Sequence, residues 1–252
     1  MKRANFRWLT TLALVTASPA SFALNVAYIE DGGTSVGYLT PFGDNVTVIA
    51  NPTGLTASAL SGYNAVLVAS NGEFSDPTGI GNALTQYANA GGGVVLTEFD
   101  FQSPTGLALG GTINNPGYSP FTVSSGNYYG THTLSTVFQS SSPILNGVNV
   151  SSVTTNYAST VGLSAGATLV ADWSNGSPAI AYNSLANSKI VGLNLYPDAA
   201  FLASADYALV ANALVFSTQS TPAAPVPLPA SAWLMLSGVV GFGAFARRRG
   251  IV

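Results

Sequence analysis

The feature that most constrains the fold is a helix placed between two short apolar runs. Asp76 is a suitable N-cap and Pro77 suits the first helical position, and apolar residues then recur at helical spacing as far as Ala88. The runs 65–69 and 94–97 flank this helix and are almost wholly apolar. A strand, a helix and a strand in this order predict a right-handed crossover and a parallel sheet.

Other runs predict further strands of the same sheet. Each is short, mostly apolar and bounded by residues that favour turns. They are residues 25–29, 46–50 and 190–195, with a short helix over 55–60. Continuous apolar strands separated by helices need cover on both faces. The predicted fold class is therefore α/β, flavodoxin-like, with a mostly parallel sheet and helices on both faces.

A hairpin and a last helix complete the predicted elements. Apolar runs flank Ser174-Asn175-Gly176-Ser177, and Asn-Gly between such runs favours two strands joined by a tight turn. Ser204 is expected to cap a helix that packs on the sheet through Leu209, Ala213 and Phe216.

Part of this pattern resembles the class I glutamine-amidotransferase-like fold, in particular its trehalose-utilisation-like branch. The residues concerned are GYNAVLVASNG, from Gly62, and YANAGGGVVLTEF, from Tyr87, within segments 25–99 and 189–216. The resemblance implies a nucleophilic cysteine just after the strand that ends at Thr97. This chain has Glu98-Phe99-Asp100-Phe101 there and contains no cysteine, so the amidotransferase activity should be missing.

The N-terminus is typical of a secretory signal peptide. Lys2, Arg3 and Arg7 accompany an apolar run over residues 8–17, and Ser21-Phe22-Ala23 offers the small residues that a signal peptidase recognises. We expect residues 1–23 to be removed. The α/β domain then covers residues 24–216, with an irregular β-rich insertion at about 101–166, and residues 217–225 form a flexible linker.

The last part of the chain, residues 226–252, has three segments. It opens with Val226, Pro227, Leu228, Pro229 and Ala230, where the prolines keep the backbone extended. Residues 230–246 are uncharged and apolar, and as a helix of roughly 25 Å they would span a bilayer. Arg247, Arg248 and Arg249 follow, and arginines beside such a span stay on the cytoplasmic side. The pattern therefore predicts one transmembrane helix, with its first residues outside the cytoplasm and its last residues on the cytoplasmic side.

This order resembles the PEP-CTERM sorting signal of Gram-negative bacteria, in its Val-Pro-Leu-Pro variant. The resemblance implies an inner-membrane intermediate, recognition by an exosortase-type enzyme and removal of the tail near the proline motif. It further implies that the body reaches the cell surface or extracellular matrix, usually beside exopolysaccharide. The alternative is an ordinary single-pass anchor behind a proline linker.

The charge of the body and the absence of cysteine limit the kinds of partner and site that the protein can have. Six of the seven basic residues lie in the two targeting segments, so the body keeps Lys189 and ten acids, a formal charge of −9. Such a surface repels nucleic acid and anionic lipid and favours cations or neutral, hydroxyl-rich partners. The absence of cysteine excludes disulfides, thiolate metal sites and thiol nucleophiles.

Seven of the ten acidic residues lie in the segments that follow predicted strands. They are Glu30, Asp31, Glu73, Asp76, Glu98, Asp100 and Asp198. The carboxyl ends of parallel strands meet at one edge, where ligands bind in open α/β sheets. Crowded carboxylates repel one another unless a cation relieves them, which makes calcium a candidate ligand. In the alternative, Asp76 only caps its helix and the other acids are solvated loop residues.

The chain also contains a pattern typical of serine hydrolases. Residues 33–37 match a nucleophile elbow, and Ser35, Asp100 and His132 follow the order of an α/β-hydrolase triad. The pattern recurs at residues 162–166, as a Gly/Ser-rich chain readily produces it. His132 is the only histidine and is expected to be a solvated loop residue. The insertion's tyrosines, available for stacking on sugar rings or for ordinary packing, are Tyr118, Tyr128 and Tyr129.

Three functions follow from these observations. The first is an exported surface or matrix protein whose body performs no catalysis. The second is a module that binds calcium or polysaccharide at the acidic strand edge. The third is a serine or carbohydrate-active hydrolase. The sequence has no P-loop, dinucleotide fingerprint or zinc-ligand spacing, so no cofactor is expected.

Overall fold

The computed structural model describes residues 23–33, 35–102, 107–123 and 126–220. The strands are β1 (Asn25–Glu30), β2 (Asn45–Ala50), β3 (Ala65–Ala69), β4 (Gly93–Thr97), β5 (Asn127–Val137), β6 (Thr154–Ser159), β7 (Thr168–Trp173), β8 (Pro178–Ser184) and β9 (Lys189–Leu193). The helices are α1 (Ala57–Leu60), α2 (Pro77–Asn89) and α3 (Ser204–Ser217). Short 3-10 turns are η1 (Gly37–Phe42), η2 (Glu98–Phe101), η3 (Gly111–Asn114), η4 (Pro143–Leu145) and η5 (Val150–Ser152).

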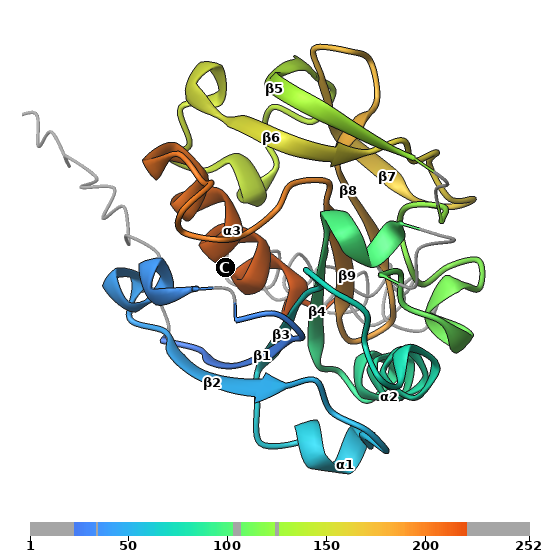
Figure 1. Cartoon of the computed structure of the whole chain (residues 1–252). Helices are drawn as coiled ribbons and strands as arrows, with labels where there is room; N and C mark the ends of the chain where they lie inside the picture. The colour runs from blue at the N-terminus through green and yellow to red at the C-terminus, as the bar shows by residue number, and fades with distance from the viewer. Residues whose placement is uncertain (1–22, 34, 103–106, 124–125, 221–252) are drawn as a thin grey trace, which may run out of the picture.

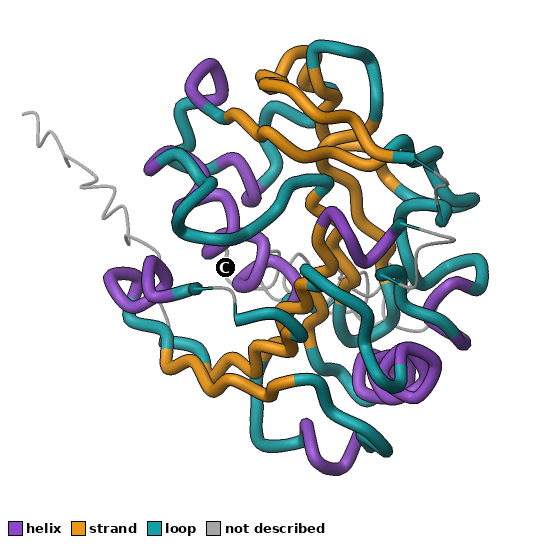
Figure 2. Tube along the Cα trace, viewed as in Figure 1, coloured by secondary structure: helices purple, strands orange, loops and turns teal. Residues whose placement is uncertain are grey.

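The described strands form one mixed sheet in the order β2-β1-β3-β4-β9-β8-β7-β5-β6. The first five strands of this order are parallel. The remaining strands pair antiparallel, from β9–β8 to β5–β6. Figure 2 shows the strands as a continuous band that ends at β5 and β6. The parallel prediction therefore holds for the core of the sheet and is wrong for its outer half, which is built from hairpins.

Helices cover both faces of the parallel core, as predicted (Figure 1). Successive residues of β3 alternate between two apolar clusters, because strand side chains point to opposite faces. Leu67 packs in the cluster that contains α3, and Val66 and Val68 pack in the cluster that contains α2. Both helices therefore bury their apolar sides against the same sheet.

Several local predictions are confirmed. The Asp76 carboxylate accepts a hydrogen bond from the Gly79 N–H at 2.9 Å, which caps α2. The turn between β7 and β8 contains Gly176 at φ 82°, a left-handed conformation that favours glycine. The expected helix over 55–60 is observed as α1.

Two local predictions are wrong. The sequence predicts a buried strand over residues 46–50, but β2 is an edge strand and Val48 is 55% exposed. The N-cap of α3 is Ala203 rather than Ser204. Asp206 completes this cap, because its carboxylate accepts the Ala203 N–H at 2.9 Å. An apolar run alone does not distinguish an edge strand from a central one, and Ser204 lies one position too late to cap.

The targeting segments lie outside the described residues, so the sequence-based predictions for 1–22 and 226–252 stay predictions. Within the described residues, no helix is long and apolar enough to cross a membrane.

Candidate functional site

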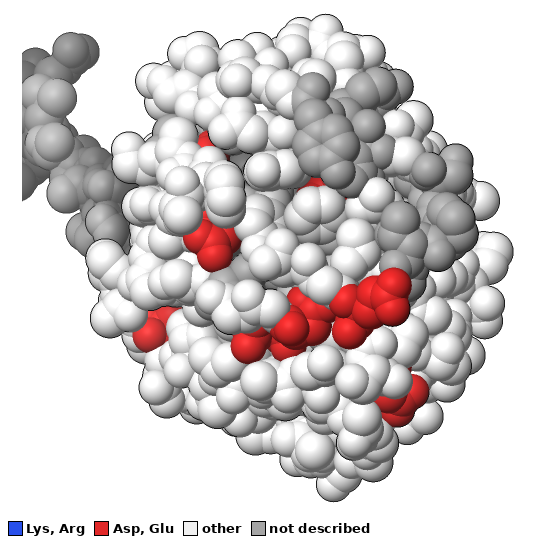
Figure 3. Space-filling model, in the orientation of Figure 1, with Lys and Arg blue, Asp and Glu red and all other residues white. Residues whose placement is uncertain are grey.

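Acidic side chains gather at the carboxyl edge of the parallel strands. Glu30 is the last residue of β1, and Glu98 directly follows β4. Asp198 lies in the loop after β9. Figure 3 shows acidic side chains in a band across the middle of one face of the molecule. The predicted crowding at this edge is therefore present.

Two acidic residues, Glu30 and Asp31, hold the loops after β1 and β3 through hydrogen bonds to backbone N–H groups. The Asp31 carboxylate accepts hydrogen bonds from the backbone N–H groups of Asn71 at 2.6 Å and Gly72 at 2.9 Å. Glu30 accepts the N–H of Gly32 at 3.0 Å and that of the next residue. Asp31 thus ties two neighbouring loops together, which is a structural use of its negative charge.

Asp198 performs the same task between the loops after β1 and β9. Its carboxylate accepts the Ser35 N–H at 3.0 Å and the Ala200 N–H at 2.7 Å. Asp76 accepts the Gly54 N–H at 3.1 Å besides capping α2. The alternative interpretation of Asp76 as a helix cap is therefore confirmed. Glu73 is exposed at the surface.

Glu98 differs from the other acids at this edge because it is wholly buried, at 0% exposure. Its Oε1 accepts a hydrogen bond from the Ser159 hydroxyl at 3.0 Å. Its Oε2 has no hydrogen-bond partner among the described residues. Burial raises the pKa of Glu98 to about 8, the Ser159 hydrogen bond opposes the rise, and the neighbouring Asp100 adds to it. At neutral pH the carboxyl therefore keeps its proton most of the time.

Asp100 is the second buried acid, at 2% exposure. Its Oδ2 accepts the Thr97 N–H at 2.8 Å, which closes the first turn of η2. Burial raises the pKa of Asp100 to about 8; the backbone N–H groups of Thr97 and Ser70 oppose the rise, and Asp31 adds to it. Asp100 therefore shapes the turn that presents Glu98.

Asn194 connects β6 to this edge. Its side-chain amide donates to the carbonyl oxygens of Ser159 and Pro178, both at 2.9 Å, and its Oδ1 accepts the Ser159 N–H at 2.8 Å. The Trp173 indole N–H donates to the Asn194 backbone carbonyl at 2.9 Å. These bonds hold Ser159 where its hydroxyl meets Glu98.

Four aromatic rings pack beside Glu98. The Tyr196 ring centroid lies 5.3 Å from that of Phe99, 6.0 Å from that of Tyr157 and 5.6 Å from that of Phe201. The centroids of Tyr157 and Phe201 are 5.5 Å apart, with the rings edge to face. Phe201 is 46% exposed. The cluster therefore presents the Phe201 ring to solvent, beside the half-buried Tyr157, while Tyr196 and Phe99 are buried beneath them.

The acids and the aromatic cluster belong to one site. Burial raises the pKa of the Tyr196 hydroxyl well above its ordinary value, and four carboxylates add to this rise. In decreasing order of effect these are Asp198, Asp31, Glu30 and Glu98. The chain also places acids and rings together, because Tyr196 lies two residues before Asp198 and Phe99 directly follows Glu98. We call this combination of carboxylates and rings the carboxyl-edge site.

Among the described residues, no group of three or more histidine, cysteine, aspartate or glutamate side chains is placed to hold a metal ion. The acids of the carboxyl-edge site are spread over several loops and bond to backbone N–H groups. Calcium binding therefore stays a prediction from sequence.

The residues of the hydrolase hypothesis lie in three different elements. Ser35 is tied to Asp198 through its backbone, and Asp100 lies in η2. His132 lies on β5, opposite Thr155 of β6. Of the tyrosines considered for stacking, Tyr118 accepts a hydrogen bond from the Asn89 side chain at 3.1 Å, on the side of α2. Tyr128 and Tyr129 lie on β5, with their backbones beside β6.

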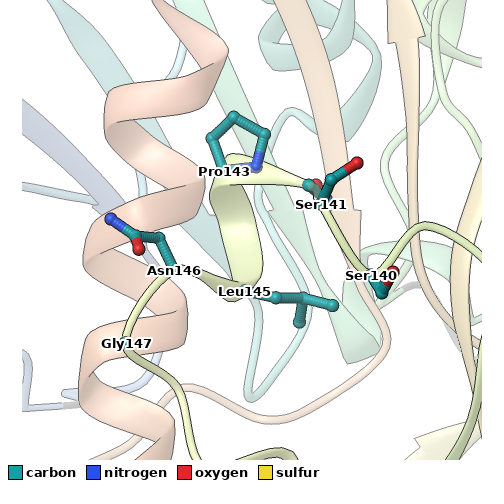
Figure 4. A pocket seen from close by; sticks show the side chains of 7 residues that line it. Ser140, Ser141, Pro143, Leu145, Asn146 and Gly147 are labelled. Atoms are coloured by element: carbon teal, nitrogen blue, oxygen red, sulfur yellow. The ribbon is translucent and has the colours of Figure 1, made fainter.

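Two surface pockets lie away from the acids. One, of about 420 Å³, is formed by Ser140–Ser142, Pro143 and Leu145–Gly147, beside α3 (Figure 4). The other, of about 350 Å³, has Tyr63, Tyr87 and Thr218 in its wall. The first lies in the insertion, where Ser140 and Ser141 are exposed.

No protein-family model matches the sequence, and no curated protein matches it either. Solved structures do match. A ThuA-like protein from Bacteroides uniformis gives a TM-score of 0.56 at 12% identity, over 80% of this chain and 95% of that one. A cytoplasmic protein from Salmonella typhimurium gives 0.58 at 11% identity, over 77% and 99%.

A GMP synthase component from Thermoplasma acidophilum gives a TM-score of 0.52 at 13% identity, over 78% of this chain and 95% of that one. The fold is ThuA-like and amidotransferase-like. The resemblance noted in residues 62–72 and 87–99 is thus confirmed for the fold, and identities this low carry no further conclusion.

Sequence reasoning identified the acids and missed the residues that turn the edge into a site. The missed residues are Tyr157, Ser159, Asn194, Tyr196 and Phe201. One signal was available, because Asn194 interrupts an apolar run that ends a predicted core strand. A buried amide at such a position needs hydrogen-bond partners, which it finds on β6 and β8.

Proposed function

We propose that this chain is an exported surface protein, processed through its C-terminal sorting signal, whose body binds polysaccharide and performs no catalysis. Support for export comes from the sequence alone: a signal peptide at one end, and Val226–Ala230 followed by an apolar span and Arg247–Arg249 at the other. An exosortase-type enzyme would remove the tail near the prolines, after passage through the inner membrane. The body would then lie at the cell surface or in the extracellular matrix.

The observation that supports binding best is the aromatic surface of the carboxyl-edge site. Phe201 is 46% exposed and packs against Tyr157 and Tyr196. Aromatic rings with one face in solvent stack on the apolar faces of sugar rings, and nearby polar groups accept the sugar hydroxyls. The place where the resemblance implies a nucleophilic cysteine is occupied by buried Glu98. These features favour binding over acyl transfer.

Intact-mass measurement on the native protein tests the processing step. Material outside the inner membrane should lack residues 1–23 and the tail that follows the proline motif. Replacing Pro227 and Pro229 by Ala should leave the tail in place and keep the protein in the membrane fraction. Surface protein of full precursor mass would contradict this step.

A polysaccharide pull-down tests the binding step. Phe201→Ala should lower retention on the host's exopolysaccharide by about tenfold, since loss of one stacking ring costs roughly 1–1.5 kcal/mol. Phe138→Ala is the matched control, because Phe138 is 52% exposed and follows β5. Equal retention of both variants and the parent would remove the carboxyl-edge site from the proposal.

A further inference from the structure

The sequence contains three Asn-Gly pairs, and the structure holds them by different hydrogen bonds. They are Asn71-Gly72, Asn146-Gly147 and Asn175-Gly176, and all three asparagines are exposed. We propose that Asn146 is a site of spontaneous deamidation, which converts it to aspartate and isoaspartate, and that the folded structure protects the other two. This modification does not depend on what the carboxyl-edge site binds.

Deamidation of an Asn-Gly pair needs a glycine nitrogen that can reach the asparagine side chain. This nitrogen attacks Cγ of the asparagine, loses its proton to solvent and expels the side-chain nitrogen as ammonia. Water then opens the resulting succinimide ring at either carbonyl group, which gives aspartate or isoaspartate. One water is consumed and one ammonia is released, without oxidation or reduction. A glycine N–H that is held by an acceptor must first lose that hydrogen bond, so such a bond slows the reaction.

Two of the three pairs have their glycine N–H held in this way. The Gly72 N–H donates to the Asp31 carboxylate at 2.9 Å, whose negative charge also opposes loss of the proton. In Asn175-Gly176, the glycine N–H donates to the Trp173 carbonyl at 2.8 Å, and the asparagine Oδ1 accepts from Ser177, whose N–H lies at 3.0 Å and hydroxyl at 2.8 Å. Neither pair can close the ring until these bonds open.

The third pair forms the centre of a surface turn. The Val148 N–H donates to the Leu145 carbonyl at 3.1 Å, which closes the turn. Asn146, at φ −63° and ψ 121°, and Gly147, at φ 69°, are the two central residues of a type II turn. Within the described residues, neither the Gly147 N–H nor the Asn146 side chain makes a hydrogen bond. Both residues are exposed beside the pocket of about 420 Å³ (Figure 4), so the attacking nitrogen and the side-chain amide have room to approach.

One hydrogen bond restrains the peptide group that must move. At the observed ψ of 121°, the Gly147 nitrogen is turned away from the Asn146 side chain, so the peptide between them has to rotate before the ring closes. The carbonyl of this peptide accepts the Asn212 side-chain amide of α3 at 2.8 Å. Asn212 therefore slows the reaction without preventing it. Isoaspartate adds a methylene to the backbone and shifts this carbonyl, so the modification also loosens the turn from α3.

Peptide mapping of the purified protein tests the proposal. The folded protein is incubated at pH 8, and mass spectrometry of a chymotryptic digest separates the asparagine, aspartate and isoaspartate forms of the three pairs. We expect residue 146 to react about tenfold faster than residues 71 and 175, because its glycine N–H has no hydrogen bond to open. In urea the three rates should become similar, because the turns and their bonds are lost. Equal rates in the folded protein, or the same spread of rates in urea, would overturn the proposal.

Two variants identify the structural cause. Asn212→Ala releases the peptide between residues 146 and 147, so it should raise the rate at residue 146 about fivefold and leave residues 71 and 175 unchanged. Asn146→Gln keeps the amide but would need a larger ring, so it should remove the fast reaction. A rate at residue 146 that Asn212→Ala does not raise, or an equal rise at all three pairs, would overturn the role of Asn212. Fast release of ammonia from Asn146→Gln would overturn the assignment of the site.

Discussion

Glu98 and Asp100 keep their protons at neutral pH because they are buried, and this makes the stability of the fold depend on pH. Their carboxyl pKa values rise from 4.5 and 3.8 to about 8. The folded state therefore binds protons that the unfolded chain releases above its ordinary pKa values. Stability from these groups is fully present below about pH 4 and is lost as the pH rises through 8. We expect Tm to fall by about 5–10 °C between pH 5 and pH 9, measured by calorimetry.

Matched variants identify the residue responsible. Glu98→Gln keeps the size of the side chain and cannot ionise, so it should flatten the pH dependence and raise Tm at pH 9. Glu73→Gln removes a carboxylate that is already exposed and should leave the profile unchanged. A profile that Glu98→Gln does not alter would show that Glu98 is ionised in the folded protein.

Asn194 is the residue whose loss should damage the carboxyl-edge site most. It makes three side-chain hydrogen bonds, to both backbone groups of Ser159 and to the carbonyl of Pro178. Asn194→Ala leaves these groups buried without partners, so the free energy of unfolding should fall by about 2–4 kcal/mol in a urea titration. Asn156→Ala, which removes an exposed bond to Thr131, should cost less than about 0.5 kcal/mol. Equal losses for the two variants would contradict the role of Asn194.

At the level of elements, the sequence was sufficient wherever a local pattern decides the structure. Residues 76–97 carry a cap, a helical period and a buried strand, and each appears as predicted. The Asn-Gly turn between β7 and β8 is likewise local. Such features depend on residues a few positions apart, and side-chain chemistry alone determines them.

The placement of β5 and β6 could not be predicted in this way. The sequence predicts an irregular β-rich insertion but not that its strands join the main sheet. There they bring Ser159 to Glu98, 61 positions earlier in the chain. That contact depends on Asn194, which lies 35 positions after Ser159. Contacts between residues so far apart in the chain produce no periodic pattern in the sequence. The acids of the site could therefore be predicted from their positions after strands, but their aromatic neighbours could not.

The start of α3 gives a prediction at the same scale. Asp206 is wholly buried and accepts the N–H groups of Ala203 at 2.9 Å and Thr154 at 3.3 Å, so it joins the helix to β6. Asp206→Ala should lower the free energy of unfolding by about 1–2 kcal/mol and speed amide exchange at Thr154. Ser204→Ala should change neither, because the Ser204 side chain makes no capping bond. A larger effect of Ser204→Ala would restore Ser204 as the cap.

Across the whole molecule, the carboxyl-edge site and the end of the described chain lie at opposite edges of the sheet. Helix α3 begins near the carboxyl edge, where Asp206 bonds to β6. It ends at Ser217, which packs against Gly93, the first residue of β4. The segment that leads to the predicted sorting signal therefore starts from the amino edge. A protein tethered through that segment would hold the carboxyl-edge site away from the tether.

Lys189 holds the segment after α3 at the amino edge of the sheet. It is only 6% exposed, its Nζ donates to the Gln219 carbonyl at 2.5 Å, and Nζ lies 4.8 Å from the centroid of the Phe216 ring. Burial lowers the pKa of the Lys189 ammonium. The chain contains one other lysine, Lys2, within the predicted signal peptide. An amine-reactive ester should therefore leave Lys189 of the folded protein unlabelled.

Lys189 should react only after the fold is opened in urea, when mass spectrometry should detect its label. Lys189→Met keeps most of the packing on Phe216 but removes the bond to Gln219. It should therefore speed proteolysis after Ser217 without altering the proposed polysaccharide binding at the opposite edge. Rapid labelling of Lys189 in the folded protein would show that the amino edge does not hold the start of the linker. The carboxyl-edge site would then lack a fixed direction relative to the tether.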